Sequence, residues 1–542
     1  MTSVHKSSSR ALVALGAAGL VATLALPSTA VAAAAYPSDT AKPDPITLLQ
    51  SYGTYWASAS TPAAPFAGAV ADAAVMSRDD QLVVWINNHA TAAQQFLALQ
   101  DSLYDNAGTA YDQSITVGTG LGSVLGAAYI AGRNSGALPK TTALINSETG
   151  TAGAYLSTGV AKAAFSHPRP YLPTDPTEAA PAGDNPGCDP ATYNGAGQAS
   201  IRVGKAWADA DGNLLVNRVA ATTDTTKQFA PNDVPLDPDY ATDTGICTGG
   251  SFPSGHTLTA YEAGITLATL VPELAPEVLT RASENGINRN VLGVHYPLDI
   301  MGGRIAGQAA LAARWSDATF RDQVLVPART ELVDYLQQAC GGTLAVCIAR
   351  QQTYTSNPFG GAAMPGGTAQ IVTDRVSALA TFTERLTYGF PRVTAAGQPA
   401  SVPAGASNLL LTTFPTLTDA QRTAVLAQTE IDSGFPLDGT GTAAGGWERL
   451  NLAAATSATV QVAADGSLRV TATGGTARVV ATAPGTTTPP PTTPPTSVGP
   501  ILANTGADTT PLALVSLILL VSGGAILVGS HRLGRREGAH RG

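Results

Sequence analysis

The fold of this chain is decided by residues 254–315, which read SGHTLTAYEAGITLATLVPELAPEVLTRASENGINRNVLGVHYPLDIMGGRIAGQAALAARW. After Ser254, a residue type that often caps helices, apolar side chains recur at the spacing of an α-helix. The same pattern returns from Ala275 to Val291 and from Pro297 to Trp315, where proline suits a first helical turn. The stretch therefore predicts three consecutive helices.

Most of the remaining chain also has helical patterns, and one long segment does not. Residues 44–165 are rich in Ala and Leu at helical spacing. Residues 171–251 are dominated by Pro, Gly, Asp and Thr without a period, which predicts a long loop. Further helices are expected at residues 332–338, at residues 373–386 and after Thr418, and a β-hairpin is expected around the turn Asp465-Gly466. The predicted fold class is mainly α, with a helical-bundle core, a long disulfide-held loop and a small C-terminal β-hairpin appendage.

The predicted domain organisation has six parts. These are a signal peptide (1–32), a helical catalytic core (36–330), a C-terminal extension packed on the core (331–456), a small β-hairpin segment (457–483), a Thr/Pro-rich linker (484–500) and a sorting signal (502–542).

The N-terminus has the pattern of an export signal. Lys6 and Arg10 precede an apolar run from Ala11 to Pro27, and small residues follow at 28–32. This three-part order is typical of a secretory signal peptide. The alternative is an uncleaved membrane helix, for which the run is short. We therefore expect an exported protein.

The C-terminus carries a second targeting pattern. Residues 502–506 read LANTG and precede an apolar stretch at 512–528 and a basic tail. The arrangement resembles the signal by which sortases attach surface proteins to the bacterial cell wall, with cleavage between Thr505 and Gly506. Sortase and peptidoglycan are the implied partners, and the Thr/Pro tract at 484–500 would span the wall. The alternative is a single-pass anchor. Either way, the protein is expected at the wall or outer membrane face of a Gram-positive-type bacterium.

Charge and cysteine content narrow the function further. A net charge of −9 argues against a nucleic-acid partner, which requires a basic surface. The four cysteines form an even set in an exported protein, so two disulfides are expected. Of the three pairings, we prefer Cys188 with Cys247 and Cys340 with Cys347. Since there is no Cys-x-x-Cys spacing, metal binding by the thiols is not expected.

Three separated segments carry side chains that suit anion chemistry. In the first, Lys162 and Arg169 lie seven residues apart, about two helical turns, so both cations could share one face. In the second, Pro253-Ser254-Gly255-His256 places a histidine at a helix start, where backbone N–H groups bind anions. In the third, Asn288-Arg289 precedes His295 and Asp299, which are four residues apart and within reach of each other.

Histidine usage links the three segments. Between the two terminal signals the chain has four histidines. Three of them, His167, His256 and His295, lie in these segments, and His89 lies outside. His167 is expected at the rim of the site at most.

In this order the segments resemble the signature of the type 2 phosphatidic-acid phosphatase superfamily, which includes bacterial class A acid phosphatases and vanadium haloperoxidases. The pattern Lys-x6-Arg-Pro, Pro-Ser-Gly-His, Arg-x5-His-x3-Asp is matched at each position, and the secreted acid phosphatases are the closest in pattern. Two features depart from it. Asn288 stands where the family usually has Ser, and the gap from Pro170 to Pro253 is longer than usual.

The resemblance implies metal-independent hydrolysis of phosphomonoesters through a phosphohistidine, with no cofactor. His295 would be the nucleophile, Asp299 would orient it, and His256 would protonate the leaving oxygen and then activate water. The phosphate oxygens would be held by five residues: Lys162, Arg169, Ser254, Gly255 and Arg289.

Other functions remain open at this point. A vanadium haloperoxidase would bind vanadate at His295 in the same site. The short spacing between His256 and His295 favours a phosphatase. A membrane lipid phosphatase and a non-catalytic wall-anchored protein are further alternatives. The set of charged site residues is complete, which argues against a non-catalytic wall-anchored protein.

Overall fold

The computed structural model describes residues 36–103, 112–179, 186–238, 240 and 246–481. The α-helices are α1 (Pro37–Thr40), α2 (Pro45–Leu48), α3 (Ala73–His89), α4 (Ala92–Leu103), α5 (Gln113–Val117), α6 (Ser123–Asn134), α7 (Pro139–Ile145), α8 (Gly159–Phe165), α9 (Ala199–Arg202), α10 (Gly255–Leu270), α11 (Ala275–Val291), α12 (Pro297–Arg314), α13 (Ala318–Phe320), α14 (Val326–Cys340), α15 (Leu344–Arg350), α16 (Arg375–Glu384), α17 (Asp419–Thr429) and α18 (Leu452–Ala455). The strands are β1 (Trp56–Ser58), β2 (Gly68–Val70), β3 (Thr222–Asp224), β4 (Val234–Leu236), β5 (Thr459–Val462), β6 (Leu468–Ala472) and β7 (Arg478–Ala481). A mainly α fold is confirmed.

Short 3-10 and π segments connect these elements. They are η1 (Gln50–Thr54), η2 (Gly118–Leu121), η3 (Pro186–Cys188), η4 (Ala196–Gln198), η5 (Pro272–Leu274), η6 (Arg321–Leu325), η7 (Ala406–Leu410) and η8 (Trp447–Arg449).

The three predicted central helices are α10, α11 and α12, and they form the buried centre of the molecule. α10 packs against both α11 and α12. All residues of α11 are buried, although the helix carries several charged side chains. A helix with no exposed face must satisfy its polar groups inside the protein, and this makes α11 a scaffold for buried polar clusters.

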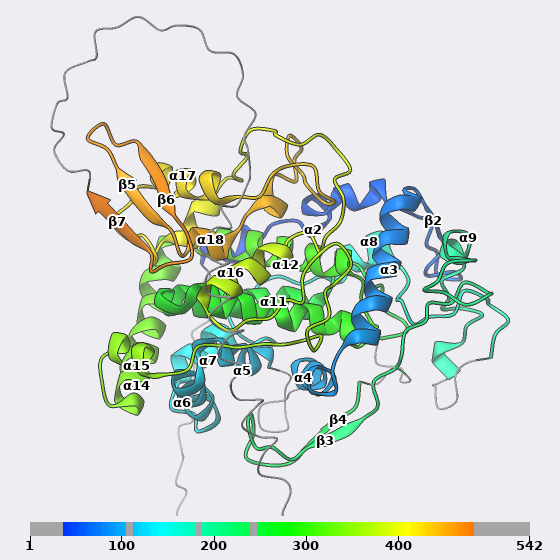
Figure 1. Ribbon diagram of the computed structural model, residues 1–542, viewed down its shortest axis with the longest axis horizontal. Helices are drawn as coiled ribbons and strands as arrows, with labels where there is room; N and C mark the ends of the chain where they lie inside the picture. The colour runs from blue at the N-terminus through cyan, green and yellow to red at the C-terminus, as the bar shows by residue number, and fades with distance from the viewer. Residues whose placement is uncertain (1–35, 104–111, 180–185, 239, 241–245, 482–542) are drawn as a thin grey trace, which may run out of the picture. The chain divides into compact units, whose positions relative to one another are not determined.

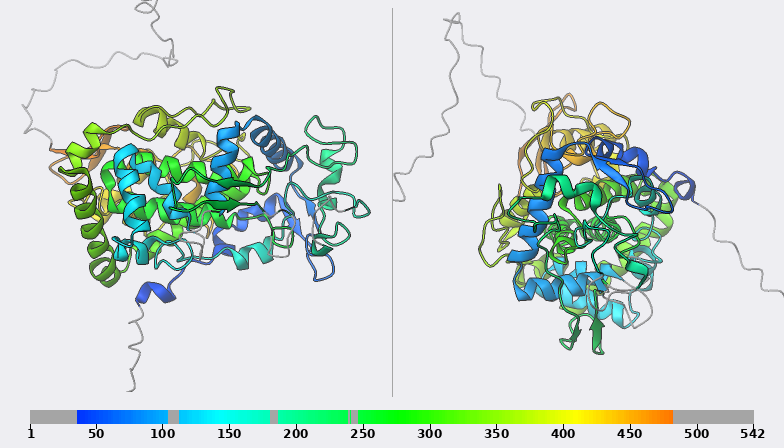
Figure 2. Two further views of the ribbon diagram at one scale, coloured as in Figure 1. Left: turned by 90° about the horizontal axis from the view of Figure 1, so that it is seen from below. Right: turned by 90° about the vertical axis from the view of Figure 1, so that its right-hand side faces the viewer.

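Two groups of helices enclose this centre. In Figure 1, α4 to α7 lie on one side of α11, and α16, α17 and α18 lie on the other. α4, α16 and α18 all contact α11. The right-hand view of Figure 2 shows the same order, with green segments between the cyan and the yellow ones. Residues beyond 330 thus pack directly on the central helices.

The C-terminal β structure is larger than the sequence indicates. A hairpin around Asp465-Gly466 is present as the antiparallel pair β5 and β6. A third strand, β7, pairs with β5 in parallel, so the sheet has the order β6-β5-β7. The predicted hairpin is confirmed, and β7 extends it to a three-stranded sheet. β7 has no turn signal linking it to β5, because a parallel neighbour requires a longer connection.

The segment between residues 171 and 251 is the predicted long, disulfide-held connection, and it also contains short regular elements. It contains the helix α9 and the antiparallel hairpin of β3 with β4, which projects from the helical body (Figures 1 and 2). A disulfide joins Cys188 to Cys247 across this segment, with their Cα atoms 5.6 Å apart. The cross-link restrains a long excursion that returns to the central helices just before Ser254.

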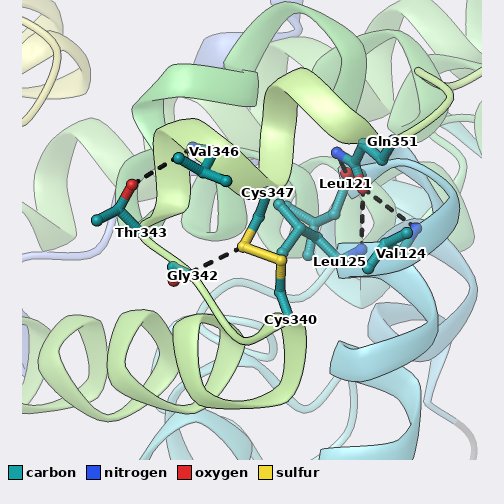
Figure 3. The surroundings of a disulfide bond; sticks show 9 residues. All are labelled: Leu121, Val124, Leu125, Cys340, Gly342, Thr343, Val346, Cys347 and Gln351. Carbon is teal, nitrogen blue, oxygen red and sulfur yellow. Dashed lines mark hydrogen bonds between the residues drawn. A yellow bond between two sulfur atoms is a disulfide. The ribbon is translucent and has the colours of Figure 1, made fainter.

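The second disulfide is local and joins the end of α14 to α15. Cys340 and Cys347 are bonded with their Cα atoms 6.1 Å apart (Figure 3). Gly341 ends α14 with a φ of 73°, a left-handed conformation that suits glycine. Nearby, the Gln351 side chain accepts backbone N–H groups of Val124 and Leu125 at the start of α6 (Figure 3). The two disulfides have the pairing that the sequence analysis prefers.

Several predicted segments lie outside the described residues. They are the signal peptide (1–32), the linker (484–500) and the sorting signal (502–542) with Thr505 and Gly506. Among the helices that the structure does describe, none combines the length and the apolarity needed to cross a membrane.

Candidate active site

His295 and Asp299 are brought together by the start of α12. α11 ends at Val291, and Gly293, with a φ of 68°, turns the chain back toward the centre. Tyr296 is the N-cap of α12, and the Asp299 carboxylate accepts the Tyr296 N–H at 2.8 Å. The same carboxylate oxygen lies 3.0 Å from His295 Nδ1. Both side chains are buried, so this pair is fixed by helix capping as well as by its own hydrogen bond.

The Arg169 guanidinium lies beside the other ring nitrogen of His295. Its Nη1 atom donates to the Val294 carbonyl at 2.9 Å and lies 3.1 Å from His295 Nε2. Because a guanidinium only donates, His295 Nε2 must be the unprotonated nitrogen, and Nδ1–H must donate to Asp299. The tautomer of His295 is therefore determined from both sides.

Lys162 reaches the same region from α8, but it does not share a helical face with Arg169. The helix ends at Phe165, and Ser166 adopts a left-handed conformation with a φ of 42°. Arg169 is on the loop that follows, so the expectation of a shared helical face was wrong. Lys162 Nζ donates to the carbonyls of Gly250 and Ser251 at 2.5 and 3.2 Å. The returning 171–251 segment, rather than helical periodicity, determines where both cations point.

The Pro-Ser-Gly-His motif forms the start of α10. Ser254 is the N-cap, and its Oγ accepts the Thr257 N–H at 3.2 Å. Its backbone N–H donates to the Asp299 carbonyl at 3.0 Å, which ties α10 to α12. Gly255 is the first helical residue, where an N–H has no acceptor within the helix. His256 Nε2 lies 3.2 Å from the Ser102 carbonyl of α4.

Arg289 comes from the last turn of α11 and contacts the Ser102 hydroxyl. Ser102 therefore touches both Arg289 and His256, although no motif marks it in the sequence. Asn288, the departure from the family pattern, donates to Asp101 at 2.7 Å and contacts Gln94. It joins α11 to α4 and makes none of the described hydrogen bonds to the predicted site residues.

The electrostatics of this cluster favour an anionic ligand. Lys162, Arg169 and Arg289 supply three cations, and Asp299 supplies one carboxylate. Burial, followed by the Arg169 charge, lowers the pKa of Lys162 well below its usual range. Burial raises the pKa of Asp299 to about 7, although the Tyr296 N–H and the nearby cations oppose this rise. Excess buried positive charge is costly without a counter-charge, which a phosphate dianion would supply.

The two site histidines are neutral in this environment. Burial, then the charge of Arg169, lowers the pKa of His295 well below its usual range. Burial, then the charge of Arg289, does the same to the pKa of His256. A neutral His295 retains the lone pair on Nε2 that a nucleophile requires.

His167 does not lie at the rim of the site, and that expectation was wrong. Its side chain is fully buried behind Ser251, whose hydroxyl lies 2.9 Å from His167 Nδ1 and 3.4 Å from an Asp299 oxygen. The sequence motifs did not identify Ser251 as a neighbour of the site, although it stands only two residues before the Pro-Ser-Gly-His motif. Proximity to that motif was the one signal that could have identified it.

A large cavity lies elsewhere in the molecule, apart from the predicted site residues. It has a volume of about 1050 Å³ and lies between α4, α6 and residues 352–357. None of the predicted site residues lines it. Its charged wall residues all have partners: Arg281 pairs with Asp101, Glu284 accepts the Tyr354 hydroxyl, and Lys227 pairs with Asp233. In the described part of the chain, no three His, Cys, Asp or Glu side chains form a group that could hold a metal ion.

Comparison with known proteins agrees with this geometry. Residues 144–322 match the PAP2 superfamily, and this segment contains every predicted catalytic and phosphate-binding residue. The chain is 37% identical over 100 residues to an acid phosphatase of Zymomonas mobilis, covering 17% of this chain and 38% of that protein. It is 33% identical over 79 residues to a non-specific acid phosphatase of Providencia stuartii, covering 15% and 32%.

A third relative is named for a specific substrate. The chain is 35% identical over 77 residues to the decaprenylphosphoryl-5-phosphoribose phosphatase of Mycolicibacterium smegmatis, covering 14% of this chain and 42% of that protein. The chain thus spans only about a third to two fifths of the length of these relatives.

Proposed function

We propose that this protein hydrolyses phosphomonoesters through a phosphohistidine on His295, without a metal ion. The observation that carries the proposal is the orientation of His295. Its Nδ1–H is held by Asp299 at 3.0 Å, and its Nε2 lone pair points to the Arg169 guanidinium at 3.1 Å. A cation beside the nucleophile would hold the phosphoryl group of a bound phosphoester there. The Nε2 lone pair would then face the phosphorus.

In the first step, His295 Nε2 attacks phosphorus and the bond from phosphorus to the leaving oxygen breaks. Lys162, Arg169 and Arg289 hold the phosphoryl oxygens and stabilise the charge on them. Asp299 stabilises the positive charge that forms on the imidazole ring. His256 gives a proton to the leaving oxygen. The nearby negative charge of the substrate raises the pKa of His256, so this ring can carry that proton once substrate is bound.

In the second step, water replaces the histidine. His256, now neutral, takes a proton from the attacking water. The new oxygen–phosphorus bond forms, the Nε2–phosphorus bond breaks, and its electron pair returns to Nε2. The site then holds inorganic phosphate, and His295 is restored.

The acid phosphatase relatives support a small phosphomonoester as substrate, and the mycobacterial relative supports a lipid-linked phosphate as the alternative. The terminal sequence patterns support a location outside the cell, attached by sortase to peptidoglycan. Fractionating cells that express the full chain tests this location. Recovery in the cytosol would contradict it.

The central test uses purified protein and p-nitrophenyl phosphate in the presence of EDTA. We expect turnover by the wild type, and loss of at least about 10³-fold in kcat for His295→Ala. His89→Ala is the matched control, because His89 is exposed on α3 and stacks on Trp85. Rapid quenching with radiolabelled substrate should trap an acid-labile phosphoprotein that His295→Ala does not form.

The competing activities are measured in parallel. Halide oxidation with vanadate, bromide and peroxide, without phosphate release in the first assay, would identify a haloperoxidase. Release of phosphate only from a lipid-linked phosphate would identify the lipid alternative.

A further inference from the structure

His167 occupies a buried position that phosphoryl transfer does not require. Three aromatic rings surround its imidazole, with centroid distances of 4.9 Å to Trp56, 5.0 Å to Tyr296 and 5.8 Å to Tyr52. Burying a histidine costs free energy unless both ring nitrogens have partners. Both do: Nδ1 meets the Ser251 hydroxyl, and Nε2 meets the Gln198 side-chain amide.

These contacts belong to a longer chain of hydrogen bonds that begins at Arg202 of α9. Arg202 donates to both carboxylate oxygens of Asp80, at 3.0 and 2.8 Å, so its guanidinium is held in a bidentate pair. It also donates to the Gln198 carbonyl oxygen. From there the chain continues through His167 and Ser251 to Asp299.

The direction of every bond in the chain follows from its first member. Arginine can only donate, so Gln198 presents its oxygen to Arg202 and its NH₂ group to His167 Nε2. His167 must then carry its proton on Nδ1 and donate it to Ser251. The Ser251 hydroxyl is left to donate to Asp299 Oδ1 at 3.4 Å.

We propose that His167 is a positioning residue which, through Ser251, holds the Asp299 carboxylate ionised and oriented toward His295. One carboxylate oxygen receives Ser251, and the other receives the N–H groups of Tyr296 and His295. This inference rests on the proposed function, because it concerns the residue that orients the nucleophile. It uses residues of the long 171–251 segment that the catalytic roles leave unexplained.

The surroundings of Asp299 make this bond consequential. Burial brings the pKa of Asp299 to about 7, and the Ser251 hydroxyl is one of the groups that lower it. The other charged or titratable groups facing Asp299 are Lys162, Arg169, His295, Asp79, Tyr52 and Tyr296. Burial, followed by the Arg202 charge, lowers the pKa of His167 well below its usual range. His167 therefore acts as a neutral donor relay rather than as a charge.

The test is the pH dependence of kcat/KM for variants of the relay. His167→Phe removes the donor to Ser251, and Ser251→Ala removes the donor to Asp299. Both should raise the pKa of Asp299 and move the acid limb of the profile upward by about one pH unit. KM for p-nitrophenyl phosphate should change little. The double variant should shift no further than Ser251→Ala alone, because the two residues act through the same bond.

Two variants separate positioning from packing. His167→Asn keeps an N–H near the position of Nδ1 and should restore the wild-type acid limb. Trp56 lies in the same aromatic pocket but donates to the Phe165 carbonyl, not to the relay, so Trp56→Phe is the packing control. It should lower stability without moving the acid limb. Unshifted profiles for His167→Phe and Ser251→Ala would overturn the proposal.

A second readout does not depend on folding of His167→Phe or on turnover. Removing one hydroxyl in Ser251→Ala disturbs packing least, so this variant carries the test if His167→Phe does not fold. The ¹⁵N-histidine NMR signals of His295 report the ionisation of Asp299 directly. The pH midpoint of their titration should also rise in Ser251→Ala. If the wild type lacks phosphatase activity, the proposed function fails, while this titration still decides the relay.

Discussion

Helix α11 carries two buried arginines in opposite electrostatic surroundings. Arg281 donates to both oxygens of Asp101, at 2.9 and 2.5 Å, and lies 3.7 Å from Glu284. Although burial opposes its charge, Asp101 raises the pKa of Arg281 further above its usual value. Arg289, two turns along the helix, shares its surroundings with Lys162 and Arg169 and contacts the Ser102 hydroxyl. The first arginine is paired with described carboxylates, and the second lies among the other cations of the candidate site.

The difference separates a structural cluster from a binding site. A balanced buried pair stabilises the fold only as long as both partners remain. An unbalanced cation cluster costs stability in the free protein and recovers that cost when an anion binds. The two arginines should therefore respond to substitution in opposite ways.

The largest effect is expected at Arg289. Arg289→Ala removes one of the proposed phosphate contacts and should lower kcat/KM by about 10³-fold. Because it also removes repulsion within the cation cluster, the melting temperature should stay unchanged or rise. Activity assays paired with calorimetry measure both. A large fall in stability with retained activity would place Arg289 with the balanced cluster instead.

The next effect concerns Arg281. Arg281→Met leaves the Asp101 carboxylate buried without its partner, and should cost about 3–5 kcal/mol of unfolding free energy. Denaturant titration measures the cost. Adding Asp101→Asn should recover much of it, since the uncompensated charge is then gone. If the single variant is as stable as the wild type, the pair is not the structural element inferred here.

The smallest effect is expected at Asp79, a buried carboxyl next to Asp299. One oxygen accepts the Leu298 N–H at 3.0 Å, and the other has no hydrogen-bond partner among the described residues. Burial, then the Asp299 charge, raises the pKa of Asp79 well above its usual range. Asp79 thus stays protonated in the folded state over a pH range in which it is ionised in the unfolded state.

The sign of its pH dependence follows. Folding requires Asp79 to take up a proton, so its cost to stability begins above the unfolded pKa of about 3.9 and grows as pH rises. Asp79→Asn should therefore stabilise the protein by about 1.5 kcal/mol at pH 5 and by clearly less near pH 4. Thermal unfolding at both pH values measures this. A variant that destabilises equally at both would contradict a neutral Asp79.

The balanced and unbalanced clusters also differ in how well the sequence predicts them. The chemistry of Arg289, His256 and His295 is carried by motifs with fixed spacing, so those residues could be identified before the structure was known. Arg281, Asp101 and Ser102 lie in ordinary helical patterns. Their partners are on distant helices, and side-chain pairing across 180 residues leaves no periodic signal.

Contacts between distant segments account for the features that the sequence did not indicate. The third strand β7, the helix α9 within residues 171–251 and the burial of His167 all depend on such contacts. Local composition indicates what a segment favours in isolation, and tertiary packing can override that preference.

By itself, the sequence determined the three central helices, the mainly α class and the residue types of the site, because helical periodicity and short motifs are local. Only the tertiary structure decided that Lys162 and Arg169 converge through a loop, and that His167 lies behind Ser251 rather than at the rim. The physical reason is that buried polar groups must find partners wherever the fold brings them, and those partners are set by packing rather than by spacing along the chain.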